Sequence, residues 1–174
     1  MTTTRSTLKR AAATLAAVEP GVEAVGTRRS IVIEAVEPEI DGGRYPVKRV
    51  AGDDLRVTAD IFADGHDLLD AALLLRAEDE LSWREVAMRL VDNDRWSGTV
   101  RLRRNAPHRY RIEAWRDAIG TWREATRRKL EAGAPVATEL VEGRILLEAT
   151  LPRTRGADAA LIREALARES RARS

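Results

Sequence analysis

The stretch Leu55–Asp67 constrains the fold most, because a strand pattern runs directly into a turn pattern. From Leu55 to Ile61, apolar and polar residues alternate strictly. This period of two is typical of a strand with one buried face. The sequence Ala63-Asp64-Gly65-His66-Asp67 then gathers residues that favour turns. We therefore predict a half-buried strand at Leu55–Phe62 in the middle of a small antiparallel sandwich.

Other segments on both sides carry similar strand signals. Pro38 ends the first, and Asp41-Gly42-Gly43 predicts a tight turn, since glycine accepts positive φ. In the first strand Ala35 is expected on the buried face, and Tyr110 is expected at a tyrosine corner of the kind found in immunoglobulin domains. The predicted strands are Arg29–Glu37, Arg44–Arg49 as a proline-marked edge, Asp70–Glu78, Trp83–Leu90, Arg95–Leu102 and Arg109–Arg116.

After Asp117 the apolar period changes from two to three and four, which indicates helices. The first is predicted at Thr121–Ala132, with Gly133 and Pro135 ending it. Thr138 is the predicted cap of a second helix and Asp158 that of a third. The apolar side chains expected on these helices are Ile119, Trp122, Leu130, Leu140, Val141, Ile145, Leu147, Leu161, Ile162, Ala165 and Leu166.

These elements predict a mostly β plus α fold, an immunoglobulin-like antiparallel β-sandwich followed by a partial helical bundle. The predicted organisation is a flexible tail at residues 1–28, a sandwich domain at 29–118 and an incomplete helical bundle at 119–174. The short alanine-rich run within the tail is interpreted as a weak helix and not as a signal peptide. No segment reaches the length of a transmembrane helix, so we expect a cytoplasmic protein without a membrane partner.

Composition excludes several kinds of chemistry. The chain has no cysteine, which excludes disulfides, thiolate metal sites and cysteine nucleophiles. Its two histidines, His66 and His108, lack the spacing of metal ligands. Charged residues make up 33% but leave a net charge of only +2, which argues against a nucleic-acid partner. No catalytic pair, metal cluster or cofactor motif is present, so we assign no catalytic, cofactor-binding or metal-binding residue.

Each of two surface features can be interpreted either as a ligand-binding site or as ordinary protein surface. Arg101, Arg103, Arg109 and Arg111 would share one exposed sheet face across a hairpin and could hold phosphate, although a solvated face is favoured by the interspersed glutamates. Trp83 is the candidate platform for a sugar ring, while a tryptophan at such a position also serves simply to cover a core.

One family matches several short blocks of this sequence in order. The blocks are Ile31-Val32-Ile33-Glu34, Asp41-Gly42-Gly43-Arg44-Tyr45-Pro46-Val47-Lys48-Arg49, Asp60-Ile61-Phe62-Ala63-Asp64-Gly65-His66-Asp67, Asn93-Asp94-Arg95-Trp96, Glu113-Ala114-Trp115-Arg116-Asp117 and Thr121-Trp122-Arg123. Over about residues 29–151 the chain resembles the N-terminal region of the α-1,4-glucan:maltose-1-phosphate maltosyltransferases of the α-amylase clan.

The resemblance implies part of a retaining enzyme that transfers maltosyl units from maltose 1-phosphate to α-glucans in glycogen or glucan synthesis. It implies a homodimer whose interface this region helps to build, and a catalytic barrel as the region's own partner. The barrel's nucleophile and acid/base have no counterpart in these 174 residues, so we expect a truncated accessory and dimerisation region that is inactive by itself.

Within the matched blocks, six polar or aromatic residues are the predicted docking edge toward the barrel. They are Arg44, Tyr45, Lys48, Arg49, Asp64 and His66. Two alternatives remain open: a free-standing carbohydrate-binding sandwich that holds α-glucan without chemistry, and an interaction domain without any ligand.

Overall fold

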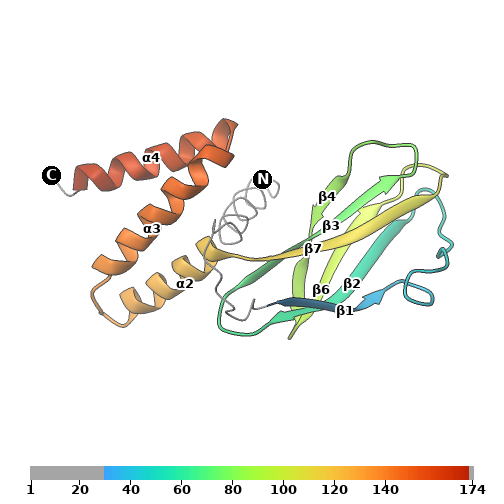
Figure 1. Ribbon diagram of the computed structural model, residues 1–174, viewed down its shortest axis with the longest axis horizontal. Helices are drawn as coiled ribbons and strands as arrows, with labels where there is room; N and C mark the ends of the chain where they lie inside the picture. The colour runs from blue at the N-terminus through green and yellow to red at the C-terminus, as the bar shows by residue number, and fades with distance from the viewer. Residues whose placement is uncertain (1–29, 173–174) are drawn as a thin grey trace, which may run out of the picture. The chain divides into compact units, whose positions relative to one another are not determined.

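The computed structural model describes residues 30–172, which form two compact units (Figure 1). Residues 30–65 and 69–115 make the sandwich unit, and residues 66–68 and 116–172 make the helical unit. The tail predicted at residues 1–28 lies outside the described residues, and the domain boundaries predicted from the sequence stay predictions.

The sandwich unit consists of two antiparallel sheets, as predicted. In the first sheet the strand order is β1-β2-β6-β5, with β1 Ile31–Glu37, β2 Asp54–Ala63, β5 Arg89–Asp92 and β6 Arg95–Arg101. In the second sheet the order is β4-β3-β7, with β3 Leu69–Ala77, β4 Arg84–Ala87 and β7 His108–Arg116.

The core lies between the two sheets and confirms the alternation in the sequence. The inward residues of β2 are buried: Leu55, Val57, Ala59 and Ile61. Trp96 of β6 is 7% exposed, as expected of a core residue, and its indole N–H donates to the Ile61 carbonyl at 3.2 Å. From the second sheet the core receives Ala71, Leu73, Leu75 and the partly buried Val86, Tyr110, Ile112 and Ala114.

The single strand predicted at Trp83–Leu90 is wrong. The chain changes sheets at Met88, so that β4 pairs with β3 and β5 pairs with β6. Met88 is buried at the crossing, while Leu90, expected on the same inward face, is 55% exposed. Periodicity alone could not find this change, because both short strands continue one alternating pattern.

Strand β1 also departs from its predicted alternation. Its pairing with β2 shifts register between Glu34 and Glu37, and Ala35 has a positive φ of 48°. This bulge turns Val36 toward the core in place of Ala35, which is exposed. The extended edge predicted at residues 44–49 is not a strand; only an isolated bridge joins Ile40 to Tyr45.

The helical unit holds three α-helices and one short 3₁₀ turn. They are α2 Ala118–Glu131, α3 Ala137–Thr150, η1 Leu151–Arg153 and α4 Gly156–Ala172. The cap of α2 is Asp117, whose carboxylate accepts from the Gly120 amide at 2.8 Å. The predicted caps are wrong: Thr138 lies inside α3, whose cap residue Val136 makes no side-chain hydrogen bond, and Asp158 lies in the first turn of α4.

A close contact positions α2 against α3. The Trp122 indole N–H donates to the Glu139 carbonyl at 2.5 Å, and a Cβ added at Gly143 would lie 2.1 Å from the Trp122 ring. Lys129 of α2 also forms an ion pair with the buried Glu139 carboxylate, which lowers the pKa of Glu139. A glycine on α3 is therefore required for the approach of the two helices.

Candidate functional site

A groove of about 1040 Å³ opens along one side of the sandwich unit. One wall is β7, of which residues 108–112 all line the groove, and the other wall includes Ile33 and Val36 of β1. The loop between β1 and β2 borders it with Tyr45 and residues 46–49. The floor is apolar, because the groove reaches the core residues Leu55, Leu75 and Leu102.

The rim of the groove is basic. Lys48 and Arg49 line it, and within residues 30–172 neither side chain forms an ion pair; the Arg49 guanidinium donates to the Lys48 carbonyl at 2.8 Å. The other lining arginines are neutralised locally, as Arg104 pairs with Asp79 at 2.6 Å and Arg109 with Glu78 at 2.9 Å. Lys48 and Arg49 are therefore the lining cations of this loop without an ion pair in the described residues, and the Glu39 carboxylate lines the same groove.

Tyr110 joins β7 to the start of that loop. Its hydroxyl donates to the Pro38 carbonyl at 2.8 Å, and burial raises the pKa of the phenol, with the Glu39 carboxylate adding to the increase. The tyrosine corner expected here is wrong, because the acceptor is 72 residues away in sequence and not in the turn just before β7.

The structure brings together some of the predicted docking residues and separates others. Tyr45, Lys48 and Arg49 line the groove, while Arg44 lies on the same loop and pairs with Asp41 at 3.3 Å. Asp64 belongs to the sandwich unit, whereas His66 belongs to the helical unit. The docking role of these residues stays a prediction.

Residues 66–68 contact the start of α2 through one ion pair and two hydrogen bonds. The Asp67 carboxylate pairs with Arg116 at 2.8 Å, the Leu68 amide donates to the Thr121 hydroxyl at 2.9 Å, and the Leu68 carbonyl accepts from the Asp117 amide at 2.7 Å. Turn-forming composition predicted a turn here but not its hydrogen bonds to a segment some 50 residues later in the chain.

Trp83 is half-buried, and two guanidinium groups lie over its ring. Those of Arg76 and Arg111 are each 4.7 Å from the centre of the ring. A sugar ring that stacks on this indole would compete with these arginines, each of which gains from a cation–π contact. The platform role of Trp83 therefore has no support in this geometry and stays untested.

The predicted arginine face across a β6–β7 hairpin is wrong. Strand β6 belongs to the first sheet and β7 to the second, so Arg101 and Arg111 do not share one sheet face. Each has a carboxylate partner, Asp54 at 3.6 Å and Glu113 at 2.7 Å respectively. These pairs agree with the solvated surface favoured from the sequence.

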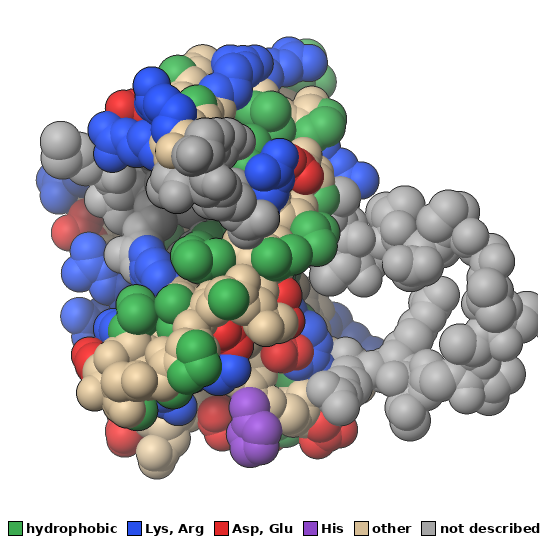
Figure 2. All heavy atoms as spheres, turned by 90° about the vertical axis from the view of Figure 1, so that its left-hand side faces the viewer, with side chains coloured by type: hydrophobic (Ala, Val, Ile, Leu, Met, Phe, Trp, Pro, Cys, Tyr) green, Lys and Arg blue, Asp and Glu red, His purple; other side chains and the backbone are tan. Residues whose placement is uncertain are grey.

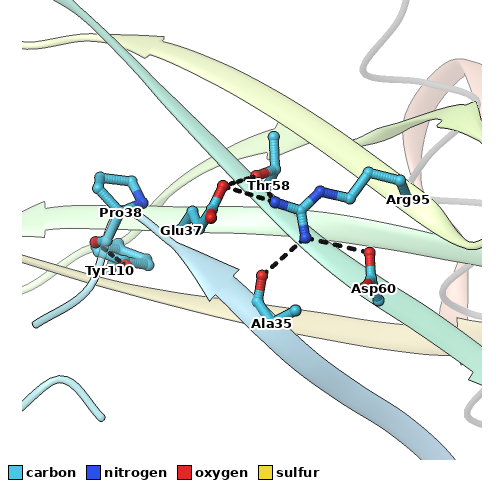
Figure 3. A network of polar contacts seen from close by, with 7 residues as sticks. All are labelled: Ala35, Glu37, Pro38, Thr58, Asp60, Arg95 and Tyr110. Carbon is cyan, nitrogen blue, oxygen red and sulfur yellow. Dashed lines mark hydrogen bonds and ion pairs between the residues drawn. The ribbon is translucent and has the colours of Figure 1, made fainter. Parts of the chain in front are cut away.

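Sequence reasoning missed the role of Arg95, which joins three strands (Figure 3). Its guanidinium donates to the Ala35 carbonyl at 2.9 Å, the Asp60 carboxylate at 3.1 Å, the Glu37 carboxylate at 2.7 Å and the Thr58 hydroxyl at 2.6 Å. The network fills the bulge of β1, so we assign Arg95 to the architecture of the sheet edge. The sequence of Ile31–Glu37 gave no signal of this network, because its alternation predicted Ala35 on the buried face.

The helical unit exposes apolar side chains, which Figure 2 shows as green patches among charged ones. On α3, Leu140 is 46% and Ile145 is 58% exposed, and the buried positions of the same helix are Glu139, Gly143 and Thr150. Large apolar residues exposed on the helices α2, α3 and α4 are Leu130, Leu140, Val141, Ile145 and Leu161, here called the helical apolar surface.

Two kinds of site are absent from the described residues. Residues 30–172 contain no group of three or more histidine or carboxylate side chains arranged to hold a metal ion. Over the same residues, no helix combines the length and the apolar character needed to cross a membrane.

Comparison with known proteins agrees with the resemblance seen in the sequence. The family model for alpha-1,4-glucan:maltose-1-phosphate maltosyltransferase, domain N/S, matches residues 29–174. The chain is 44% identical to the maltosyltransferase of Myxococcus xanthus over 147 residues, which cover 80% of this chain and 22% of that protein. It is 42% identical to that of Chlorobaculum tepidum over 132 residues, covering 76% and 20%.

A third maltosyltransferase, from Cereibacter sphaeroides, is 48% identical over 118 residues, which cover 68% of this chain and 20% of the relative. In each of these three comparisons the matched region spans about a fifth of the relative's length. Since the family model covers all of the described residues, the chain belongs to the domain N/S family of the α-1,4-glucan:maltose-1-phosphate maltosyltransferases.

Proposed function

We propose that this chain is a non-catalytic accessory and dimerisation region of a maltosyltransferase that transfers maltosyl units from maltose 1-phosphate to α-1,4-glucans. The match of the domain N/S family model over residues 29–174 carries the proposal. Its inactivity in isolation is supported by the comparisons, in which the matched region spans only about a fifth of each relative's length.

The strand order supports an immunoglobulin-like sandwich. Such domains place strands A, B, E and D in one sheet and C, F and G in the other. The order β1-β2-β6-β5 corresponds to A-B-E-D, and β3-β7 corresponds to the adjacent pair C-F. The corresponding strand G, next to β7, is absent from residues 30–172.

Dimerisation is proposed to use the helical apolar surface. Apolar side chains gathered on a surface mark interaction sites when they are not scattered singly. On α3 the exposed Leu140, Val141 and Ile145 lie on one side, away from Gly143, which packs on α2. A second copy would bury this surface by a symmetric contact, the commonest arrangement in homodimers.

Sedimentation equilibrium of the 174-residue chain tests the dimer. The wild-type chain should dimerise with rising concentration, and the double variant Leu140→Glu/Ile145→Glu should stay monomeric with an unchanged circular dichroism spectrum. Glu142→Lys, an exposed charge change on the same helix, is the matched control and should still dimerise. A wild-type monomer at all concentrations, or a double variant that dimerises normally, would refute this interface.

Inactivity is tested by phosphate release from maltose 1-phosphate in the presence of α-1,4-glucan. The chain alone should release no more phosphate than a blank. Turnover by the purified chain would overturn the accessory role.

The docking edge is proposed to include Arg44, Tyr45, Lys48, Arg49, Asp64 and His66, with the catalytic barrel as partner. The separately produced remainder of the Myxococcus xanthus relative is a usable probe, because the chain matches 22% of that protein. Lys48→Ala/Arg49→Ala should weaken co-elution with this probe, whereas Arg56→Ala on β2 should not. Equal co-elution of the two variants would count against the docking edge.

A carbohydrate-binding module is the competing function. It has no supporting geometry, because the guanidinium groups of Arg76 and Arg111 already lie over the Trp83 ring. Binding of maltooligosaccharide that is lost in Trp83→Ala would nevertheless favour it over the accessory role.

A further inference from the structure

We propose that the outward face of the first sheet binds a phosphoryl group, either inorganic phosphate or the phosphate of a monoester, over strand β6. The site consists of Arg56, Arg89, Ser97 and Thr99, which come from three neighbouring strands. The inference goes beyond the proposed function, because it assigns a ligand to the sandwich unit and depends on neither the accessory role nor the dimer.

Strand pairing places the four side chains in two adjacent rows. Arg56 of β2 lies directly opposite Thr99 of β6, and Arg89 of β5 lies directly opposite Ser97 of β6. Residues opposite each other in an antiparallel pair share a face of the sheet, and so do residues two apart on one strand. The two arginines therefore flank β6 from both sides, with the two hydroxyl groups between them.

This face of the sheet points away from the core. Trp96 and Val100 alternate with the two hydroxyl residues along β6 and are buried in the core. On the outward face Thr99 is exposed, Ser97 is partly exposed, and both arginines are exposed. A ligand from solvent can therefore reach all four side chains at once.

The hydrogen-bond donors of the site are uncommitted. Within residues 30–172 none of its four side chains takes part in an ion pair or a hydrogen bond. The other arginines on this face do: Arg95 pairs with Glu37 at 2.7 Å and with Asp60 at 3.1 Å (Figure 3), and Arg101 pairs with Asp54 at 3.6 Å. Two positive charges over β6 thus lack a counter-charge, whereas the three carboxylates named here are already neutralised.

Spacing and donor chemistry select the ligand. Neighbouring strands are about 4.8 Å apart, so the two arginines stem from strands about 10 Å apart and both reach an anion above β6. Guanidinium groups bind phosphate oxygens through paired, charge-assisted hydrogen bonds, and each hydroxyl adds one donor. A phosphoryl group satisfies all four side chains, because it offers three strong acceptor oxygens and close to two negative charges. A carboxylate offers two oxygens and a single charge.

The test follows backbone amide chemical shifts of the 174-residue chain by NMR at constant ionic strength. Inorganic phosphate and glucose 1-phosphate should each shift the amides of Ser97 and Thr99 saturably, with dissociation constants on the order of 1 mM. Acetate should bind at least about tenfold more weakly, and maltose should not shift these amides. Binding of both phosphates assigns the site to the phosphoryl group itself, and binding of glucose 1-phosphate alone assigns it to monoesters.

Substitution of the two arginines checks the charge. Arg56→Gln/Arg89→Gln should weaken phosphate binding by at least about tenfold, with an unchanged circular dichroism spectrum. The matched control is Arg153→Gln/Arg163→Gln, which removes the same charge from exposed positions of the helical unit that have no ion pair in the described residues. This control should bind phosphate as the wild type does.

Substitution of the two hydroxyl residues checks the geometry without a change of charge. Ser97→Ala/Thr99→Val should weaken phosphate binding by about threefold, because each lost hydroxyl removes one hydrogen bond to the anion. A site held by net charge alone would leave this affinity unchanged, which contradicts the proposed arrangement of donors.

Three further results would overturn the proposal: no saturable shift with either phosphate, binding of acetate or maltose as tight as that of phosphate, or equal weakening by the two double arginine variants. None of these measurements uses catalytic turnover or the helical apolar surface. A failed phosphoryl site is therefore distinguishable from a failed accessory role, which the phosphate-release and sedimentation tests address.

Discussion

The sandwich unit and the helical unit use their apolar residues in opposite ways. In the sandwich, Val57, Ile61 and Leu73 are fully buried between two sheets. In the helical unit, Ala159 and Ile162 are buried, but so are the polar Thr126, Glu139, Thr150, Thr154 and Asp158, and the helical apolar surface is exposed. The difference teaches that the sandwich holds most of its core internally, whereas several apolar side chains of the helices are exposed in the described residues.

The largest loss of unfolding free energy is expected from a substitution in the sandwich core. Leu73→Ala removes a side chain with no exposed area from the centre of the apolar cluster, and should lower the free energy of unfolding by about 3 kcal/mol. Urea unfolding followed by tryptophan fluorescence measures it. A loss below about 1 kcal/mol would mean that the sandwich core is not close-packed.

A smaller loss of unfolding free energy is expected from a substitution where α2 and α3 approach each other. Gly143→Ala places a methyl group against the Trp122 ring and should cost about 2 kcal/mol through overpacking. Trp122→Phe in the same chain should recover part of that loss, because the smaller ring leaves room. Double-mutant analysis measures the coupling, and strict additivity would contradict the close contact.

The comparison predicts almost no stability change on the helical apolar surface. Ile145→Ser, at a position 58% exposed, should change the free energy of unfolding of the monomer by less than about 0.5 kcal/mol. The same denaturation at a concentration well below dimerisation provides the measurement. A loss as large as that of Leu73→Ala would remove the contrast between the two units.

The smallest expected effect is the pH dependence of stability that Glu124 contributes. Hydrogen bonds from Arg127, followed by those from Arg128, lower the pKa of Glu124 to about 2 in the folded chain. Because the folded pKa lies below the unfolded value, the stabilisation is present above about pH 4.3 and is lost as the pH falls through the folded pKa. Solvent screening at this exposed site keeps it small.

Comparison of Glu124→Gln with the wild type isolates this contribution. The variant should lose part of the decline in thermal stability between pH 5 and pH 2, whereas Glu142→Gln, an exposed control on α3, should keep it. Identical pH profiles for Glu124→Gln and the wild type would show that the ion pairs of α2 do not contribute to stability.

Local pattern identified the sandwich strands because burial on one face imposes a period of two. It did not identify the change of sheet at Met88 or the bulge at Ala35, since both depend on which strand lies alongside. The arginine partners of Trp83 were not foreseen either, because they lie on other strands.

In the candidate groove, too, some lining residues were visible in the sequence and others were brought there only by the fold. Tyr45, Lys48 and Arg49 stood out in the sequence as members of one block, and they line the groove. Their opposite wall, residues 108–112, is far along the chain and only the fold brings it near. On the helices, the apolar stripe of α3 was visible in the sequence, but its exposure was not, because Gly143 and not leucine makes the contact with Trp122.

The sequence by itself determined most of the sandwich strands, the three helices, the inward residues of β2 and the family, because these depend on local periodicity and on ordered blocks of residues. Only the tertiary structure decided which strand is the open edge, where positive charge remains unpaired and which helix faces are exposed. Those properties depend on neighbours distant in sequence, and the burial of a side chain is a property of the contacts that surround it.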